Sequence, residues 1–169
     1  MKTAKIKLYK SLLIADIDAQ TFKRSDGVLS GESEQYKNAI SSNSEEALDL
    51  NILYRHMESR DAVIRRKLAF CLVKDDEDSL SVTNELDTQN DSFDYELKVP
   101  ETCDKQRLKA IAQNMHNYIM QGALYDWYAT QNMKGNLSAA ELEEIETSIV
   151  CMLRSSFVKR PLQPYGPRN

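Results

Sequence analysis

Residues 105–131 form the stretch that most constrains how this chain can fold. Apolar or small residues recur there at alternating three- and four-residue steps, which places them on one face of an α-helix. These residues are Leu108, Ile111, Met115, Tyr118, Gly122 and Tyr125. Ala112, Ile119 and Tyr128 widen the stripe, so the helix faces a core and not a narrow coiled-coil seam. At 1.5 Å per residue the helix is about 40 Å long, comparable to the width of a domain of this size.

A second helix is predicted to begin near Asn43 and to reach about residue 73. Asn43 and Glu46 have the spacing of a capping box. Asp61 interrupts the apolar stripe; we expect it to point to solvent, with Arg65 one turn on as its partner, and the alternative is a polar group that sets the register of a partner. The stripe consists of Leu50, Leu53, Met57, Ile64, Leu68 and Cys71.

A third helix is predicted from Ser138 to about Arg154, after a turn at 132–136. Ser138 and Glu141 form a second capping box. This helix and the long one before it form an αα-hairpin. Gly122 lies inside the long helix, where glycine costs about 1 kcal/mol relative to alanine, so we expect another helix to approach closely there. The aromatic cluster near Trp127 is expected to be core.

The N-terminal residues fit two patterns. Ala4, Ile6 and Leu8 alternate with lysines, as in a strand. A longer pattern with helical spacing favours a helix over about residues 8–23, after a short extended start, with a turn at 25–27. The helical pattern consists of Leu8, Leu12, Ala15, Ala19 and Phe22.

Two short stretches with alternating residues predict a β-hairpin at about 79–99. Leu80 and Val82 lie in the first strand, 79–83, and the second strand covers 92–99. A lone two-stranded hairpin is marginal in water, so we expect it to pack on the helices or on a neighbouring chain, with Phe93 and Tyr95 as candidate interface residues. Pro100 is predicted to open the long helix.

Residues 155–169 are predicted to form an extended C-terminal arm, separate from a single helical domain at 1–154. Three prolines favour an extended backbone, and the segment from Arg154 onwards carries four basic residues and no acidic one. Such an arm suits docking on a partner, while contact with DNA phosphates and a loose tail are the alternatives. The candidate interface residues here are Arg154, Lys159, Arg160, Tyr165 and Arg168.

The charges are separated along the chain. Residues 1–24 contain six Lys or Arg and two Asp, whereas residues 74–104 contain eleven Asp or Glu and two Lys. Basic ends and an acidic middle could complement one another between copies, or could be solvated. The net charge of −4 implies no general attraction to nucleic acid or membrane.

Motifs for chemistry are missing from the sequence. His56 and His116 are isolated, and Cys71, Cys103 and Cys151 show no metal-ligand or disulfide spacing, which favours a reducing compartment. There is no phosphate-binding glycine loop, no nucleophile elbow and no EF-hand loop. We therefore expect no enzymatic activity, no catalytic residue, no metal and no cofactor, and we find no apolar run that spans a membrane.

The chain resembles the head–tail connector proteins (adaptor or neck-ring subunits) of tailed bacteriophages over about residues 43–154. The resembling features are the helix ending RRKLAFCLV, the start VPETCDKQRLKAIAQ of the long helix, its aromatic turn DWYATQ, and the closing helix ELEEIETSIVCMLR. The acidic hairpin region and the proline-rich tail match less well, which leaves the position within the neck open.

This resemblance implies a mainly α fold, a virion location after assembly in the host cytoplasm, and homo-oligomeric rings. It further implies docking to portal, tail or other neck proteins, DNA passing through the lumen with possible non-specific contacts, and no enzymatic activity. The residues alone predict a bundle of three to four helices with one β-hairpin insertion and an extended C-terminal arm. That architecture also suits a cytosolic helical scaffold or regulatory protein that binds a helical partner.

Overall fold

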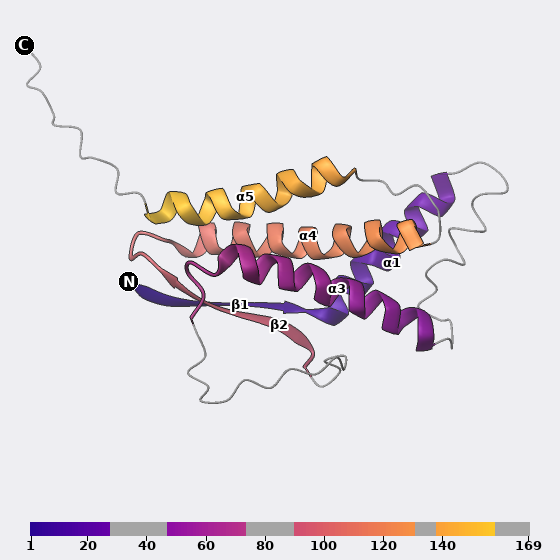
Figure 1. Ribbon diagram of the computed structural model, residues 1–169, viewed down its shortest axis with the longest axis horizontal. Helices are drawn as coiled ribbons and strands as arrows, with labels where there is room; N and C mark the ends of the chain where they lie inside the picture. Colours follow the sequence, from indigo (N-terminus) through magenta and orange to yellow (C-terminus); the bar gives the residue numbers. More distant parts are fainter. Residues whose placement is uncertain (28–46, 74–89, 131–137, 158–169) are drawn as a thin grey trace, which may run out of the picture.

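A computed structural model describes residues 1–27, 47–73, 90–130 and 138–157. Within these ranges the chain has two strands and four helices, so the prediction of a mainly α fold with a two-stranded antiparallel element is confirmed. The strands lie on one side of the molecule, helix α4 (Lys105–Thr130) runs through the middle, and helix α5 (Ala139–Phe157) lies on the opposite side of α4 (Figure 1). The predicted strand at 79–83 and residues 158–169 of the predicted arm lie outside the described residues. Residues 155–157 of that arm are instead the last residues of a helix, so the predicted boundary at residue 154 is wrong.

The N-terminus uses both of its sequence patterns in succession. Strand β1 spans Lys2–Tyr9, and helix α1 follows directly at Lys10–Gly27. The predicted helix therefore starts two residues late and continues through the expected turn at 25–27. Its buried face was also misassigned: Leu13 and Ile17 are fully buried, whereas Leu12 is 57% exposed.

Strand β2, Ser92–Val99, has the predicted bounds but a different partner. It pairs in antiparallel fashion with β1, in a register that places Ile6 opposite Tyr95. The sequence prediction did not name β1 as the partner of β2, and the predicted partner, 79–83, lies outside the described residues. The physical reason for the pairing with β1 is that β1 offers a matching alternation: Ala4, Ile6 and Leu8 face the same core as the apolar residues of β2.

Helix α3, Ala47–Leu68, lies along the other side of β2 and packs on α4. The predicted stripe is buried at Leu53, Met57 and Ile64, while Leu50 is exposed. The proposed cap at 43–46 lies outside the described residues. Asp61 pairs with Arg65 as expected, but it is only 8% exposed, so the expectation that it points to solvent is wrong.

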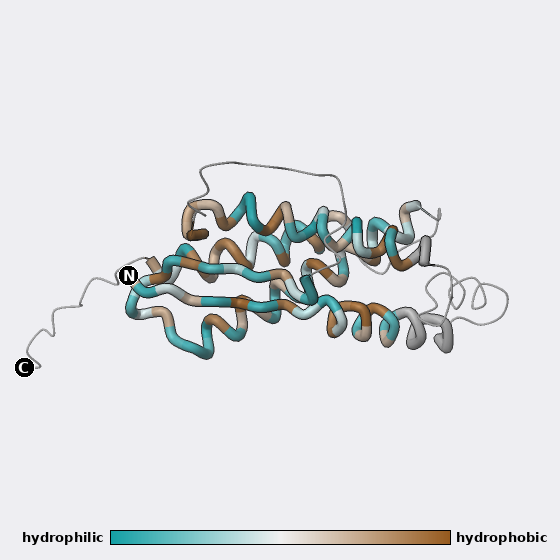
Figure 2. Tube along the Cα trace, turned by 90° about the horizontal axis from the view of Figure 1, so that it is seen from below, coloured by the Kyte–Doolittle hydropathy of each residue, from teal (hydrophilic) through white to brown (hydrophobic). Residues whose placement is uncertain are grey.

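Helix α4, Lys105–Thr130, is the central element, and it contacts α3, α5, α1 and β1. Because it has neighbours on several sides, its buried surface extends beyond the predicted stripe to Met120, Ala123 and Leu124. Trp127 and Tyr128 are core residues, as predicted. Figure 2 turns the molecule so that the β1–β2 ribbon lies nearest the viewer, with helices behind it.

The ends of α4 and α5 are set by side-chain caps. Asp104 caps α4, because the Arg107 amide donates to its Oδ1 at 2.7 Å; Pro100 instead lies in the turn before the helix, so the predicted start at Pro100 is wrong. Helix α5 spans Ala139–Phe157. Its predicted capping box is present: the Ser138 amide donates to Glu141 at 2.7 Å, and the Glu141 amide donates to Ser138 Oγ at 3.3 Å.

Gly122 marks the close approach that the sequence predicts. A Cβ atom at this position would lie 2.7 Å from Cδ of Arg60, which reaches over from α3. The Arg60 guanidinium then pairs with Asp126, with Nε donating to Oδ2 at 2.8 Å. Glycine at position 122 therefore leaves room for an ion pair that ties α3 to α4.

Candidate interaction surface

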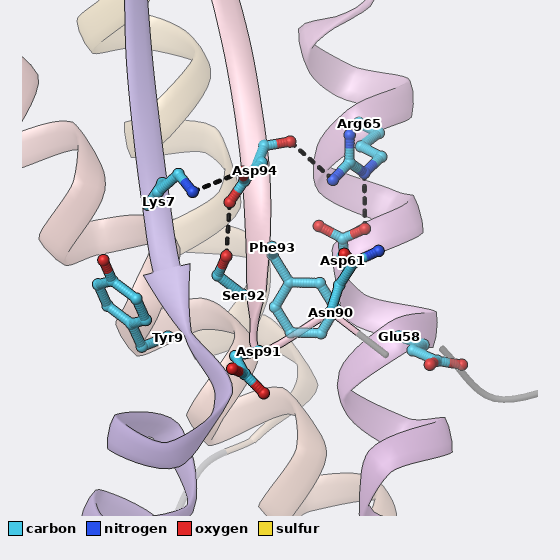
Figure 3. A pocket seen from close by; sticks show the side chains of 10 residues that line it. All are labelled: Lys7, Tyr9, Glu58, Asp61, Arg65, Asn90, Asp91, Ser92, Phe93 and Asp94. Atoms are coloured by element: carbon cyan, nitrogen blue, oxygen red, sulfur yellow. Dashed lines mark hydrogen bonds and ion pairs between the residues drawn. The ribbon is translucent and has the colours of Figure 1, made fainter. Parts of the chain in front are cut away.

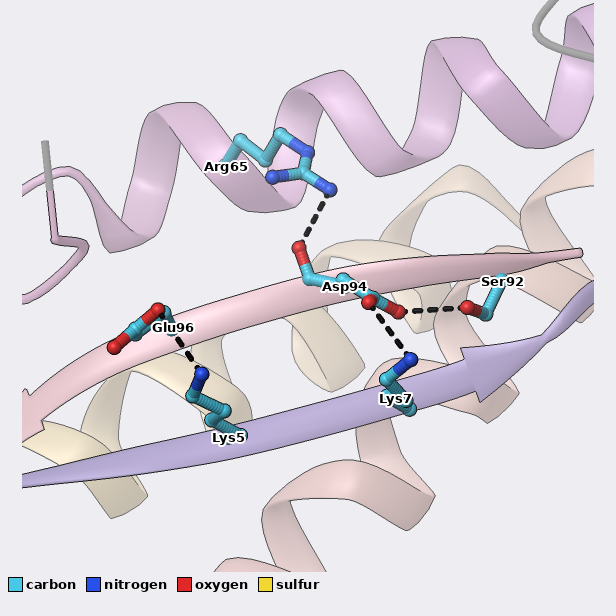
Figure 4. A network of polar contacts seen from close by, with 6 residues as sticks. All are labelled: Lys5, Lys7, Arg65, Ser92, Asp94 and Glu96. Carbon is cyan, nitrogen blue, oxygen red and sulfur yellow. Dashed lines mark hydrogen bonds and ion pairs between the residues drawn. The ribbon is translucent and has the colours of Figure 1, made fainter. Parts of the chain in front are cut away.

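The outer face of the β1–β2 ribbon carries a ladder of opposite charges. Lys5 lies 3.7 Å from Glu96, and Lys7 lies 3.1 Å from Asp94 (Figure 4). Each pair joins residues that are directly opposite in the register. Part of the complementarity between the basic N-terminus and the acidic middle of the chain is thus satisfied within one molecule.

The ladder is exposed and electrically balanced. The Ser92 hydroxyl donates to Asp94 at 2.7 Å, and this hydrogen bond lowers the pKa of Asp94 below its usual value. The hydrogen bond and the charge of Lys7 lower this pKa further. The bond to Asp94 in turn raises the pKa of Lys7. Because each lysine of the ladder already faces a carboxylate, this face offers little net positive charge to a DNA backbone.

The edge of β2 that faces away from β1 is covered by the chain itself. The Val73 amide donates to the Glu96 carbonyl at 2.8 Å, and the Lys98 amide donates to the Cys71 carbonyl at 2.6 Å. Farther along, the Arg65 guanidinium donates to the Asp94 carbonyl at 2.9 Å. Residues that follow α3, and a side chain from α3, therefore bind backbone groups along this edge.

The edge of β1 that faces away from β2 has a different environment. The Lys10 amide donates to the Asp91 carbonyl at 2.8 Å, so even-numbered residues of β1 direct their backbone groups toward β2. The odd-numbered residues direct theirs outward. Among the described residues, no other strand pairs with this side. We call these outward groups the open edge; it consists of Thr3, Lys5, Lys7 and Tyr9.

A groove of about 700 Å³ lies where the ribbon meets α3, near the start of β2 (Figure 3). At its α3 side, Asp61 accepts hydrogen bonds from the Tyr95 hydroxyl and from Arg65 Nε, the latter at 2.7 Å. The Arg65 guanidinium also lies 4.6 Å from the Tyr95 ring centre. The residues lining the groove are Lys7, Tyr9, Glu58, Asp61, Arg65, Asn90, Asp91, Ser92, Phe93 and Asp94.

Burial keeps the Tyr95 phenol neutral. Desolvation, and then the neighbouring Asp61 carboxylate, raise the pKa of Tyr95 well above its usual value. The phenol therefore remains a donor to Asp61 across the physiological pH range. This contact fixes α3 against β2, so it is part of the framework that holds the ribbon in place.

The candidate residues from the sequence divide into three groups. Phe93 and Tyr95 are 6% and 1% exposed, so most of each side chain packs within the chain. The guanidinium of Arg154 lies 5.5 Å from the ring centre of Phe70, and that ring packs edge-on against Phe157. The others, Lys159, Arg160, Tyr165 and Arg168, lie outside the described residues.

The open edge itself was missed at the level of sequence. Its signal was present, since Ala4, Ile6 and Leu8 alternate with lysines, but the competing helical pattern was favoured. Lysine on an edge strand is a common protection against uncontrolled pairing. The lysines that alternate with apolar residues at the N-terminus were therefore the available indication of an edge strand.

The described residues include potential metal ligands and three cysteine thiols. No three His, Cys, Asp or Glu side chains there gather in a way that could hold a metal ion. Burial raises the pKa of the Cys71 thiol to about 11, which keeps it protonated, and Cys151 is exposed. No helix within the described ranges has the length and apolar character needed to cross a membrane.

Comparison with known proteins gives no family assignment. No protein-family model, no curated protein and no solved structure matches this chain. Functional inference therefore depends on the geometry of the molecule and on the sequence resemblance described above.

Proposed function

We propose that this chain is a structural subunit of an oligomeric assembly, namely a head–tail connector or neck-ring subunit of a tailed bacteriophage. The observation that supports assembly most directly is the open edge of β1. Its outward backbone groups have no strand partner among the described residues, and the bundle behind it has its own core. An edge of this kind is a ready template for pairing with another chain.

The connector setting comes from the sequence resemblance, and the fold is compatible with it. A helix that ends at Leu68, a long central helix and a shorter closing helix follow one another along the chain, which is the order that the resemblance implies. In this setting the subunit makes contacts between copies and with portal or tail proteins. The balanced charges of the ribbon favour protein contacts over DNA contacts for this face.

Electron microscopy of the purified chain, alone and mixed with the portal protein of the same particle, tests this proposal. We expect rings whose mass is many times 19.4 kDa, either alone or on the portal. A chain that stays at one or two copies in both samples contradicts the ring. That outcome supports the alternative, a scaffold or regulatory protein that binds a helical partner.

A further inference from the structure

We infer that the open edge of β1 binds an extended segment of a partner protein in which acidic residues alternate with apolar ones. The segment adds a third strand to the ribbon, beside β1. This inference rests on the proposed role of the open edge in assembly, and it names the chemistry of the strand that the edge receives. All residues of the acceptor site lie in β1, within the described part of the chain.

The backbone of the open edge supplies the hydrogen bonds for an added strand. The amides and carbonyls of its four residues, Thr3, Lys5, Lys7 and Tyr9, point away from β2. These residues are evenly spaced along β1, so an extended segment can form hydrogen bonds over the length of the strand. Main-chain bonds of this kind give affinity, and the side chains on the two faces then decide which segment fits.

Charge on the outer face of the ribbon selects acidic residues. Side chains of an added strand that lie opposite Lys5 and Lys7 share the face of these lysines, at a strand spacing of about 4.8 Å. The side chains of Lys5 and Lys7 are 73% and 56% exposed, and each forms an ion pair with one carboxylate of β2. Because an ammonium group has three N–H donors, each lysine can also bind a carboxylate on its other side. Glutamate or aspartate at these positions extends the ladder across the new strand.

The inner face of the ribbon selects apolar residues between the acidic ones. Ala4, Ile6 and Leu8 line the margin of the core beside the open edge and are 7%, 5% and 5% exposed. Leu97 and Val99, in the strand whose outer edge is covered, are fully buried. Side chains of an added strand that lie opposite the inward residues of β1 share their face and cover this margin. Alternation of apolar and acidic residues therefore suits both faces.

The lysines disfavour the β1 strand of a second copy as the occupant. When two β1 strands pair in antiparallel fashion over most of their length, a lysine lies directly opposite a lysine. Like charges in that position destabilise a sheet, and lysine on an edge strand protects against such pairing. The strand that fits this edge therefore carries the opposite charge and belongs to a different protein.

A synthetic peptide tests the contact. The probe is the glutamate peptide TVEVEVT, acetylated and amidated at its ends, and its matched control is the lysine peptide TVKVKVT, which has the same apolar residues and the opposite charge. Fluorescence anisotropy of the labelled peptides, titrated with the whole chain, measures the dissociation constants. At low salt we expect the glutamate peptide to bind about tenfold more tightly than the lysine peptide. The difference should shrink at high salt, because salt screens exposed charge pairs.

Variants of the acceptor separate the contribution of the backbone from that of charge. Lys5→Pro removes an outward amide, at a position where an edge strand tolerates proline, and should weaken binding of the glutamate peptide at least about tenfold. Lys5→Thr is the matched control, because it removes the same lysine but keeps the amide, and it should weaken binding less. Lys5→Gln combined with Lys7→Gln should remove the preference for the glutamate peptide. Circular dichroism melting verifies that each variant is folded, and Lys7→Pro replaces Lys5→Pro if the latter proves unfolded.

Several outcomes would overturn the inferred contact. These are equal binding of the two peptides, binding of the glutamate peptide that Lys5→Pro leaves unchanged, and no binding at millimolar peptide. If the outward amides of β1 become protected when the chain alone is concentrated, the occupant is a second copy, and the inference is overturned as well.

The peptide experiment and the ring experiment can fail separately. Peptide binding with the expected dependence on Lys5, but no ring from the chain alone or on the portal, supports the contact and overturns the connector role. A ring without peptide binding supports the connector role and overturns the contact.

Discussion

The two edges of the β1–β2 ribbon differ in whether their backbone groups have hydrogen-bond partners within the described residues. On the β2 side, backbone groups of Cys71 and Val73 and the Arg65 side chain form hydrogen bonds with the edge. Next to Arg65, Asp61 accepts a hydrogen bond from the Tyr95 hydroxyl. The edge on the side of β1 carries lysines and has no strand partner among the described residues. Two strands alone are marginal in water, so the ribbon depends on its apolar face and its covered edge. The open edge can therefore bind another chain without loss of the fold.

The largest expected effect is a difference in stability between proline substitutions on the two sides of β1. Ile6→Pro removes an amide that points to β2 and a buried side chain, and should lower the free energy of unfolding by at least about 3 kcal/mol. Lys5→Pro, one residue away, removes an outward amide and an exposed ion pair, and should cost less than about 1 kcal/mol. Urea denaturation of both variants measures the difference; equal losses would mean that the odd-numbered amides are also bonded within the chain.

The covered edge can be weakened through Asp61. Asp61→Ala leaves the buried Tyr95 hydroxyl without this acceptor and removes the carboxylate partner of Arg65, which keeps its bond to the Asp94 carbonyl. We expect a loss of about 2–3 kcal/mol in urea denaturation. The double variant with Tyr95→Phe should lose less than the sum of the two single variants, because each change removes the same contact. Additive losses would argue against this contact.

Helix α3 is also held by its contact with α4 at Gly122 and Asp126. Gly122→Leu places atoms where Arg60 lies, so it should lower the free energy of unfolding by about 1–3 kcal/mol despite a better helix propensity. Ala129→Leu, at an exposed position of the same helix, is the control and should be nearly neutral. Thermal melting compares them, and a Gly122→Leu variant as stable as wild type would show that α3 is held by other contacts.

A smaller effect concerns His56, also on α3. Burial of the imidazole lowers the pKa of His56, with Arg60 acting in the same direction and Asp126 opposing it. The unfolded chain then takes up a proton first as the pH falls below about 6.5, so stability is full above that pH and declines below it. Between pH 7 and 5 we expect a loss of less than about 1 kcal/mol that His56→Gln removes. A pH profile that is unchanged in the variant would contradict this assignment.

Local features of the fold could be predicted from the sequence, and its pairings could not. The Ser138 cap, the bounds of β2 and most of α4 follow from patterns within a few residues of one another. The pairing of β2 with β1 joins residues about ninety positions apart, and no local signal specifies that partner. The prediction of the buried face of α1 was wrong for a related reason. Strand β1 fixes the residue at which the helix begins, and that start determines which side of the helix meets α4.

The candidate site shows the same division. Asp61 was noticed as an interruption of a stripe, but its acceptor role depends on Tyr95, which another element places beside it. Phe93 and Tyr95 were candidate interface residues because a lone two-stranded hairpin must pack on the helices or on a neighbouring chain, and the sequence does not decide between the two. The lysines of β1 were visible as an alternation, yet their function as an edge appears only when β2 occupies the other side.

Residue-resolved amide hydrogen exchange in β1 tests the central claim most directly. In dilute, monomeric protein we predict slow exchange at Ala4, Ile6, Leu8 and Lys10, and fast exchange at the alternate residues of the open edge. In the complex with the glutamate peptide the amides of the open edge should become slow as well. Equal protection of odd and even amides in the dilute monomer, or odd amides that stay fast in the complex, would contradict an open edge that receives a strand from a partner protein.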